Sequence, residues 1–537
     1  MSRDFAVKSS VKEKLRIFDW ILLAVFCGFF FYWRLASFGL IGADEPRYAQ
    51  VAREMLAAHD WITPTLGGSP WLEKPPLYYW QAMVFYRLLG VSERSARLPA
   101  VLDATFVVVG LYWFLRGFRP VFALAGSLML SSSAGMVGYA RAASMDMSLA
   151  SAFTLAMLGW YRWFETGRGR YLIACYLFLA LGMLAKGPVA PLLGVAVILI
   201  FAAAERNLTI ARRSLSLPGI LTFCAVGLPW YVLVEVRNPQ FFRVFILEHN
   251  LARFGSNMFH HPEPFWYYMP VMFLAWVPFS VFAAAALIWA LRRLRHRSLD
   301  PLSCLLVIWM LVILCFFSIS KSKLPGYILP AVPAALLLLG NYAEEKARER
   351  IGPVLVALHA TLTASLVYAA LALPYLILNH RLPRGAAGVL PSLTAALFIG
   401  VTTAVLMLRT GWPGLRVATV VPAILTLSIA LRLGAPALDE TLSARPVADR
   451  LAGLSGRQLP VAVLLVPREL EFGLEFYRNH IVDRYELGQM PAGEHLVVAL
   501  QGSKQAVLRD VAGRRVVYLG DFPRQRLEFF YVSAPSH

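Results

Sequence analysis

Two short stretches near the start of the sequence bring acids, bases and tyrosines together after the first apolar run. The first, 42–48, reads GADEPRY, and the second, 71–80, reads WLEKPPLYYW. Charged side chains beside a bilayer are costly unless they face water, a partner or a ligand. A carboxylate in such a place can accept a proton, and a lysine can bind a phosphate. These stretches are therefore the first candidates for a functional site.

Asp44 and Glu45 have two interpretations that the sequence leaves open. In the structural one, Asp44 caps a helix that has Pro46 in its first turn. In the functional one, a carboxylate lines a water-filled cavity near the membrane and acts as a base. The two are compatible, because a cap fixes the backbone that carries the acid. We take Asp44 and Glu45 as candidate catalytic residues.

Lys74 follows Glu73 and precedes two prolines, with aromatic residues on both sides. A lone lysine at a membrane interface usually extends its ammonium into water. The prolines and aromatic rings instead favour a rigidly placed ammonium that binds a lipid phosphate.

Two later motifs add further acids and bases. The stretch 141–146, RAASMD, is either a loop with a helix cap or the carrier of a second catalytic acid, Asp146. The stretch 242–254 contains His249 and Arg253, which share one helical face because they are four residues apart. A histidine beside an arginine suits an anionic lipid head, although a lone histidine is usually a surface hydrogen-bonding group.

The last polar motif, 320–327, reads SKSKLPGY. Its Lys321, Lys323 and Tyr327 predict a phosphate or pyrophosphate site, because they supply positive charge and hydrogen-bond donors; the alternative is that the lysines only reach for water. The motifs together hold many cations and several carboxylates, with no redox, thiol or nucleotide signature. Such a set suits displacement of a phosphate leaving group, in which cations stabilise the leaving charge and a carboxylate orients or deprotonates the acceptor.

The elements that must position these residues are membrane helices. The chain has 537 residues, of which 58% are hydrophobic and 15% charged, and its mean hydropathy is +0.59. The net charge of +19 does not indicate nucleic acid, because most basic residues lie in short loops between apolar runs, where they set topology and contact anionic lipid. A spanning helix needs about 20 apolar residues. By that criterion about 13 spans are predicted, at 17–38, 98–115, 121–138, 145–164, 171–185, 188–204, 216–236, 266–290, 302–318, 324–341, 351–378, 390–408 and 414–433.

Charge sorts the loops into two sets. One set is basic throughout, as expected of the cytoplasmic side, and the other carries all the unusual polar motifs. We therefore expect a cytoplasmic N-terminus, an external site and an external C-terminus. The long external loop 39–97 should hold interfacial helices, one around Tyr48–Leu56 and one at Leu77–Leu89, and Asn238–Phe254 should form a third.

The hydropathy falls at about residue 435. Beyond it, strands are predicted at Leu459–Val466, Leu496–Leu500 and Arg515–Leu519, with a helix at Glu469–Tyr477. The expected fold is an all-α polytopic membrane domain, 1–434, followed by a small external α/β domain, 435–537.

In combination, the motifs resemble those of the GT-C superfamily of membrane glycosyltransferases. The nearest resemblance is to the bacterial lipid A 4-amino-4-deoxy-L-arabinose transferases, which are related to protein O-mannosyltransferases. It covers roughly the first 340 residues, in family order, and is carried by Asp44-Glu45, 73–80, 185–188, 248–250 with 253–254, 264–268 and 320–330.

The resemblance implies roles for residues at matching positions. Asp44 would be the catalytic carboxylate and Asp146 the second acid. The donor phosphate would be held by Lys74, Arg253 and Tyr327, with Tyr48 and Tyr78 as further phosphate-binding residues. Glu73 and His249 stand where family members can hold a divalent metal such as zinc; Glu73 could also be only a neighbour of the lysine. No nucleotide cofactor is expected.

The expected activity is inverting transfer of a sugar, such as 4-amino-4-deoxy-L-arabinose, from undecaprenyl phosphate to a lipid A-type acceptor. The enzyme would lie in the bacterial inner membrane as a monomer, with its site in the periplasm and membrane lipids around it. An alternative keeps the donor and uses protein hydroxyls or another surface glycan as acceptor. A third hypothesis is a flippase or transporter of polyprenyl-linked sugars, which predicts mid-membrane charges and inverted repeats.

Overall fold

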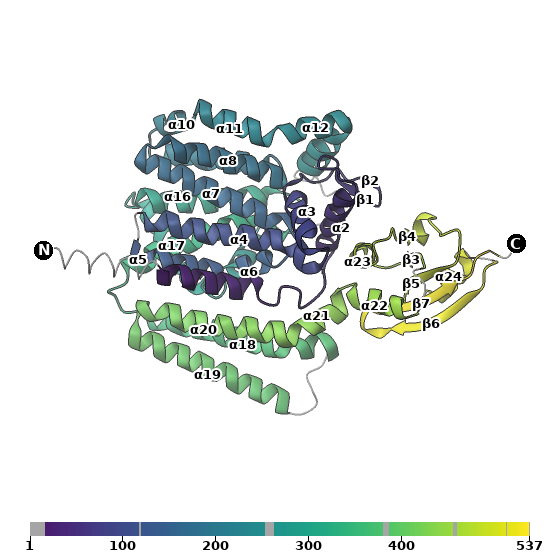
Figure 1. Cartoon of the computed structure of the whole chain (residues 1–537). Coiled ribbons are helices and arrows are strands. Elements are labelled where there is room, and N and C mark those ends of the chain that lie inside the picture. Colours follow the sequence, from purple (N-terminus) through teal and green to yellow (C-terminus); the bar gives the residue numbers. More distant parts are fainter. Residues whose placement is uncertain are drawn as a thin grey trace.

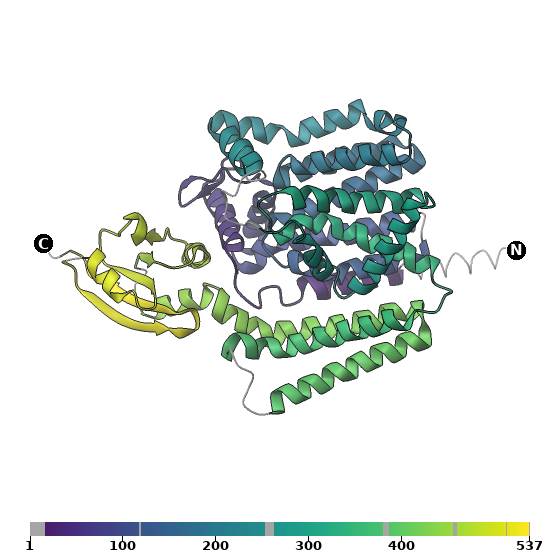
Figure 2. The ribbon, with the colours of Figure 1, turned by 180° about the vertical axis from the view of Figure 1, so that it is seen from behind.

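The computed structural model describes residues 17–117, 120–252, 263–379, 386–454, 459–511 and 513–535. Long helices lie side by side in a bundle, and a small region with a β-sheet stands beyond one end of it (Figure 1). The same arrangement is seen from behind in Figure 2, where α18, α19 and α20 form a layer along one side of the bundle. The predicted combination of a helical membrane part and a small C-terminal α/β part is confirmed.

Helices occupy every predicted span. Their bounds are Ile17–Tyr32, α4 Glu93–Arg116, α5 Pro120–Ser131, α6 Ala134–Ala140, α7 Met145–Thr166, α8 Gly169–Lys186, α9 Val189–Ala204, α10 Thr209–Ser214, α11 Leu217–Gly227, α12 Pro229–Arg237, α14 Tyr268–Ala275, α15 Ser280–Arg295, α16 Pro301–Ile319, α17 Val332–Glu345, α18 Pro353–Asn379, α19 Ala386–Thr410 and α20 Leu415–Ile429. Within the described residues, eight helices are long and apolar enough to cross a membrane, or ten if each of two bent pairs is one span. The expected number of 13 is thus not confirmed.

The two ends of the bundle differ in character. At one end, the ends of α4, α7 and α8 and the connection between α7 and α8 carry Arg116, Arg162, Arg168 and Arg170, and we call this the basic end. The other end carries α2 (Asp44–Ala57), α3 (Leu77–Leu89) and the turn Pro325–Ala331, and we call it the site end. The polar motifs of the sequence therefore gather at one end, as the loop charges predict.

The helices α2 and α3 form where the apolar spacing predicts them. On α2, Tyr48, Val51 and Met55 are buried, and they pack against Tyr78 and Tyr79 of α3. The prediction that Asp44 caps α2 is wrong: Ala43 is the cap residue, and Asp44 is the first residue of the helix, with its carboxylate in the first turn. A carboxylate there is still favoured by the positive end of the helix dipole.

The C-terminal region begins with α21 (Ala435–Leu442) and α22 (Arg445–Leu454). Its sheet has the order β4-β3-β5-β7-β6, in which β3 pairs in parallel with both β4 and β5, and β7 is antiparallel to β5 and β6. The strands are β3 Val461–Leu464, β4 Asp483–Arg484, β5 His495–Leu500, β6 Val516–Phe522 and β7 Leu527–Val532, and the helices are α23 Arg468–Arg478 and α24 Lys504–Asp510. All three predicted strands and the predicted helix are present, whereas β4, β7 and α24 have no counterpart in the prediction.

Helix α23 joins this region to the site end. It packs against α2, and Arg53 of α2 donates a hydrogen bond to the Phe476 carbonyl oxygen at 2.7 Å. The Tyr477 hydroxyl accepts a bond from the Leu40 amide at 2.9 Å. The C-terminal region is therefore fastened to the helix that begins with Asp44.

Candidate active site

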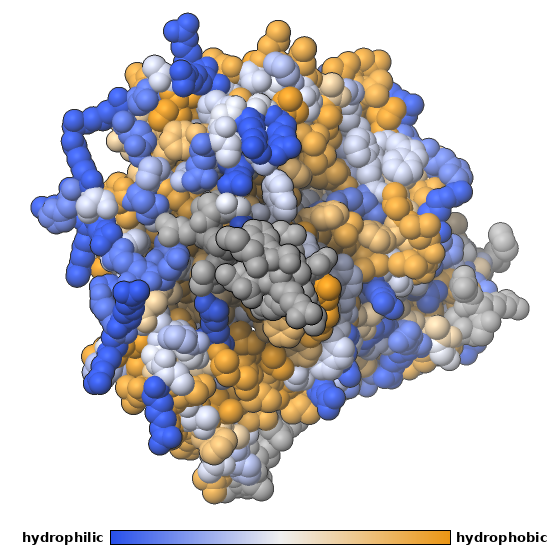
Figure 3. All heavy atoms as spheres, turned by 60° about the vertical axis from the view of Figure 1, so that its left-hand side comes forward, coloured by the Kyte–Doolittle hydropathy of each residue, from blue (hydrophilic) through white to orange (hydrophobic). Residues whose placement is uncertain are grey.

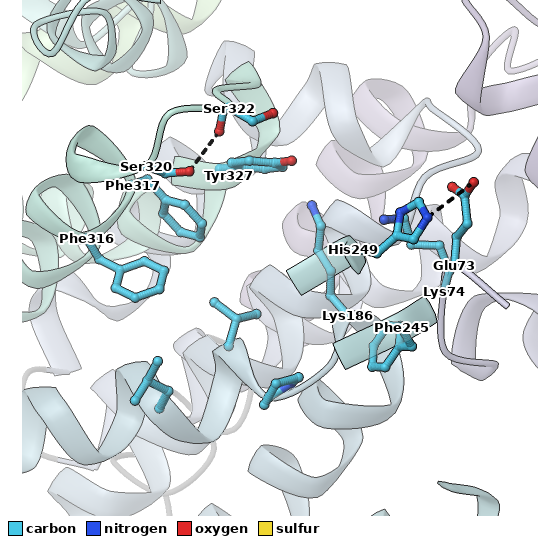
Figure 4. A pocket seen from close by; sticks show the side chains of 13 residues that line it. Glu73, Lys74, Lys186, Phe245, His249, Phe316, Phe317, Ser320, Ser322 and Tyr327 are labelled. Carbon is cyan, nitrogen blue, oxygen red and sulfur yellow. Dashed lines mark hydrogen bonds and ion pairs between the residues drawn. The ribbon is translucent and has the colours of Figure 1, made fainter. Parts of the chain in front are cut away.

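A cavity of about 350 Å³ lies at the site end of the bundle. Figure 4 shows its polar side chains converging from several segments: the loop before α3, the end of α8, the helix Arg243–Ala252, and the stretch from the end of α16 to the Pro325–Ala331 turn. The polar lining consists of Glu73, Lys74, Lys186, His249, Ser320, Ser322 and Tyr327, and the apolar lining of Pro188, Val189, Leu192, Phe245, Phe316 and Phe317. One cavity thus combines two lysines with an apolar wall, as a lipid with an anionic head would require.

Lys186 forms an ion pair with Asp146 at the centre of this arrangement. Its ammonium also lies 4.5 Å from the ring centroid of Tyr327, a cation–π contact. Ser144 caps α7 and donates its hydroxyl to the Asp146 carboxylate at 2.9 Å. The predicted residues Asp146 and Tyr327 are therefore brought together, and Lys186 is the group that joins them.

Gly326 makes this close approach feasible. A β-carbon at this position would stand 2.7 Å from the Asp146 Oδ2 atom, which is closer than real contacts allow. The turn that carries Tyr327 can therefore pass over the carboxylate only because residue 326 has no side chain.

Glu73 and His249 meet at the wall of the cavity, with 3.7 Å between the Glu73 Oε1 and His249 Nε2 atoms. The predicted metal pair is thus adjacent in space. However, the part of the chain that the structure describes contains no group of three or more metal-ligating side chains. A zinc site takes three or four protein ligands, so these two residues do not complete one.

Asp44 lies beside the cavity rather than in its lining. Its side chain is 51% exposed and forms an ion pair with Arg47. The Arg47 guanidinium packs against three rings, with 5.3 Å to the centroid of Tyr48, 5.1 Å to Trp71 and 5.7 Å to Phe472 of α23. The C-terminal region therefore supplies one wall next to the predicted catalytic carboxylate.

Tyrosines fill the space between the acids. Burial, reinforced by the charge of Asp44, raises the pKa of Tyr48, and the charge of Asp146 acts in the same direction. Burial also raises the pKa of Tyr79, which feels the charges of Arg47, Glu73 and Asp44. Both phenols therefore stay protonated even at pH values above their ordinary pKa. The Tyr79 hydroxyl and the Trp71 indole N–H are buried and have no hydrogen-bond partner among the described residues.

Glu45 is a correction to the prediction. Its side chain is only 8% exposed, and Arg97, which is fully buried, donates to both carboxylate oxygens at 3.1 and 2.8 Å. The backbone amides of Ala143 and Ile41 also donate hydrogen bonds to the Glu45 carboxylate, at 2.6 and 2.9 Å. With its oxygens so engaged, Glu45 holds α2, α4 and the loop before Asp146 together and does not reach the cavity.

Tyr78 and Lys323, both predicted as phosphate ligands, are bonded to backbone carbonyl oxygens and do not line the cavity. The Tyr78 hydroxyl donates to the Ala96 carbonyl oxygen at 2.8 Å, and the Lys323 ammonium donates to the carbonyl oxygens of Glu263 and Ser320 at 3.0 and 2.5 Å. Lys321 is exposed outside the cavity lining. The SKSK motif therefore contributes serines, not lysines, to the cavity.

The predicted phosphate ligand Arg253 lies outside the described residues. Three residues near the site were not predicted as functional: Lys186, Arg47 and Tyr79. Lys186 stands in a recognised motif, AKGP, but at the end of an apolar helix it resembles a residue that only reaches for water. Arg47 is visible in the first stretch, and the pattern gives no sign that it would pair with Asp44. Tyr79 is one of two adjacent tyrosines, and the sequence does not distinguish the one that faces the site.

Comparison with known proteins supports the resemblance. A family model described as dolichyl-phosphate-mannose-protein mannosyltransferase matches residues 73–232. The chain is 33% identical over 329 residues to an undecaprenyl phosphate-alpha-4-amino-4-deoxy-L-arabinose arabinosyl transferase of Pseudomonas fluorescens, covering 60% of this chain and 58% of that protein. It is 30% identical over 338 residues to the enzyme of that name from Yersinia enterocolitica, covering 61% and 60%. The matched part thus spans about three fifths of the length of these relatives.

The fold extends the likeness over nearly the whole chain. The crystal structure of ArnT from Cupriavidus metallidurans bound to undecaprenyl phosphate superposes with a TM-score of 0.79 and 23% identity, covering 95% of this chain and 97% of that one. The apo structure of the same protein gives a TM-score of 0.76, covering 97% and 98%. The predicted GT-C fold and the resemblance to this group of transferases are confirmed.

Proposed function

We propose that this chain is a membrane glycosyltransferase that moves a sugar from a polyprenyl-phosphate donor to a lipid A-type acceptor. The sugar is of the 4-amino-4-deoxy-L-arabinose class and the donor is undecaprenyl phosphate-linked, as the names of its relatives suggest. The observation that carries the proposal is the cavity at the site end, where Lys74 and Lys186 face an apolar wall that includes Phe245 and Phe316. The lysines suit the donor phosphate, and the wall suits the start of its hydrocarbon tail.

The reaction expected from the resemblance is an inverting displacement. An acceptor oxygen attacks C1 of the sugar from the face opposite the phosphate, the C1–O bond to phosphate breaks, and the electron pair leaves with the polyprenyl phosphate. Lys74 and Lys186 stabilise the charge that develops on this leaving group. Asp44 takes the proton where the acceptor oxygen carries one and orients that oxygen otherwise. The Arg47 ion pair holds Asp44 at the first turn of α2.

The orientation of the protein follows from its loop charges. The basic end would face the cytoplasm and the site end the periplasm, with the protein in the inner membrane. The C-terminal region would then lie in the periplasm, and the half-exposed Asp44 side chain would face an acceptor in the outer leaflet of that membrane. The chain would act as a monomer.

A protein hydroxyl as acceptor is the second candidate. It is favoured by the family model that matches residues 73–232, whose description names protein mannosyltransferases. In that reaction Asp44 would remove the hydroxyl proton, so the same residues would serve either acceptor.

The test is transfer by the purified full-length protein in detergent from a defined undecaprenyl-phosphate sugar. Lipid A and a mixture of surface proteins are offered separately, and products are identified by mass spectrometry. Sugar on lipid A is expected from the wild type. Loss of this product is expected in Asp44→Asn but not in the control Asp510→Asn of the C-terminal region. Equal transfer by wild type and Asp44→Asn would contradict the assignment of Asp44. Absence of transfer with either acceptor, despite donor movement across vesicles, would favour a flippase.

A further inference from the structure

A second elongated cavity runs along the flank of the bundle between α4, α7 and α8. Its volume is about 680 Å³, and it shares no lining residue with the cavity at the site end. Its walls are apolar for most of their length, with Val109, Leu155 and Phe178 among them. Phe106 at its edge is 53% exposed on the outside of the bundle. We call this space the flank groove.

The flank groove is open because small residues line it. Gly110, Gly159, Ala152 and Ala174 supply parts of its wall where larger side chains would fill the space. At Gly159 even a β-carbon would stand 3.1 Å from the Tyr171 carbonyl oxygen, so α7 and α8 approach closely behind the groove. A narrow apolar channel of this kind fits a hydrocarbon chain.

The polar residues deep in the flank groove are satisfied within the protein. Ser148 donates to Asp103 at 2.5 Å, and Gln81 donates to the same carboxylate at 3.0 Å. Because this cluster is hydrogen-bonded internally, it does not require a polar ligand at that depth. The ligand's polar part should therefore lie at the opposite end of the groove.

At the basic end the flank groove joins a third cavity, of about 440 Å³, which we call the mouth of the groove. The two share Trp20, Trp113 and Arg162 in their lining, and the mouth adds Tyr112 and Arg116. Tryptophan and tyrosine are typical of the level of lipid headgroups. Figure 3 turns this end of the bundle forward and shows hydrophilic side chains gathered along its left rim.

Both charged side chains in the lining of the mouth, among the residues described, are arginines. Arg116 donates to Asp19 at 2.8 Å, and Arg162 is 3.7 Å from Glu165, but neither carboxylate lines the mouth. The Arg162 guanidinium lies against Gly117, where a side chain would collide with it. Both guanidinium groups are therefore held in place at the entrance of an apolar channel. The carboxylates that pair with them, Asp19 and Glu165, lie outside the lining of the mouth.

We infer that the flank groove and its mouth bind an anionic phospholipid from the leaflet at the basic end. The phosphate lies against Arg116 and Arg162, whose planar guanidinium groups suit it, and an acyl chain lies along the apolar walls between α4, α7 and α8. Basic pockets between membrane helices are recognised sites for such headgroups. The sugar donor is not the occupant, because its phosphate belongs with Lys74 in a cavity at the other end.

The test measures lipid retention by the full-length protein and needs no sugar transfer, so only the exclusion of the sugar donor as occupant rests on the proposed function. The protein is purified in a mild detergent, stripped of lipid, and offered dioleoyl-phosphatidylglycerol or dioleoyl-phosphatidylcholine. Native mass spectrometry counts the bound lipids. The wild type should retain phosphatidylglycerol about fivefold better, the difference expected for one arginine near an anionic headgroup. Excess undecaprenyl phosphate should not displace it.

Two variants with matched controls locate the site. Arg162→Gln should remove the preference for phosphatidylglycerol, whereas Arg213→Gln, which loses an exposed arginine at the same end, should keep it. Ala174→Phe fills the groove and should lower retention of phosphatidylglycerol to the level of the neutral lipid, whereas Ala203→Phe on the exposed face of α9 should not. Equal retention of both lipids by the wild type, or an unchanged preference in Arg162→Gln, would overturn the inference. Displacement by undecaprenyl phosphate would overturn it in favour of a donor site.

Discussion

Two clusters of charged residues lie next to each other at the site end, and they differ in what surrounds their charges. In one, Glu45 and Arg97 are buried and engage each other and nearby backbone groups. In the other, Lys74 and Lys186 face a cavity with apolar walls. Glu45 adjoins Asp44 in the sequence, so the proposed catalytic carboxylate and a carboxylate that holds the helices together are neighbouring residues. The difference teaches that a charge enclosed by protein partners holds the site together, whereas a charge that lines the cavity can also meet a ligand, even where, as in Lys186, it already has a protein partner.

The largest expected effect breaks the supporting cluster. Arg97→Met should leave Glu45 charged and buried without its partner and release the carbonyl oxygens of Leu35 and Gly39. Removing one partner of a buried pair costs about 3–5 kcal/mol, so the variant should unfold at clearly lower temperature. Thermal unfolding of the detergent-purified protein measures this, with Arg213→Gln as control. An unchanged unfolding temperature would show that the pair is not a support.

Glu475 of α23 sharpens the comparison, because it is a buried carboxylate that forms no ion pair with any residue the structure describes. Burial, reinforced by the charge of Glu471, raises its pKa from 4.5 to about 8. Its neutral form is therefore favoured by folding. The stabilising contribution is full below pH 4.5 and is lost as the pH rises through 8, with a slope of up to about 1.4 kcal/mol per pH unit.

Thermal unfolding measured between pH 5 and pH 9 tests this sign. The wild type should become less stable as the pH rises, and Glu475→Gln should show a flatter curve over that range. A wild-type curve that rises with pH, or a glutamine variant with the same slope as the wild type, would contradict the account.

A moderate effect is expected from Gly326→Ala. The added methyl group must push the Asp146 carboxylate away, which disturbs its ion pair with Lys186. We expect transfer to fall by about tenfold or more, as misplacement of positioned groups commonly does. The unfolding temperature should change little, and Gly138→Ala, where a β-carbon meets nothing, is the control. Wild-type rates in Gly326→Ala would show that the placement of Asp146 is not needed.

The smallest effect is expected from Lys321→Met. This lysine is exposed and does not line the cavity, although the sequence predicts it as a phosphate ligand. Transfer should stay within about twofold of wild type, because exposed charges away from special features contribute little. A large loss would mean that the SKSK motif acts directly on the donor and would restore the original prediction.

The fold was largely predictable from the sequence because hydropathy and periodicity are local signals. Long apolar runs marked the helices, and apolar spacing marked α2 and α3. Strand β7, which pairs with both β5 and β6, is absent from the prediction although its residues are apolar and aromatic. Strand β4 is absent because it is only two residues long. The cavity residues Lys74 and Tyr327, and Asp146 beside Lys186, were predictable because their motifs interrupt apolar runs.

What could not be predicted depends on contacts between distant segments. Glu45 reads as a second acid until Arg97, 52 positions further along, is found against it. Lys323 reads as a ligand until the backbone carbonyl oxygens that occupy it are seen. Phe472 reads as part of a separate domain until α23 places it against Arg47. In each case the sequence supplies the residue, and only the packing shows which partner it meets.

The most direct test of the central claim is the affinity of undecaprenyl phosphate for the wild type and for Lys74→Met, measured by native mass spectrometry titration with Lys321→Met as control. The cavity at the site end holds the donor phosphate in this account, and a hydrogen bond to a charged group contributes about 1.5–3 kcal/mol. The account predicts that Lys74→Met binds at least about tenfold more weakly, whereas Lys321→Met binds as the wild type does. Equal affinity in Lys74→Met and wild type would contradict it.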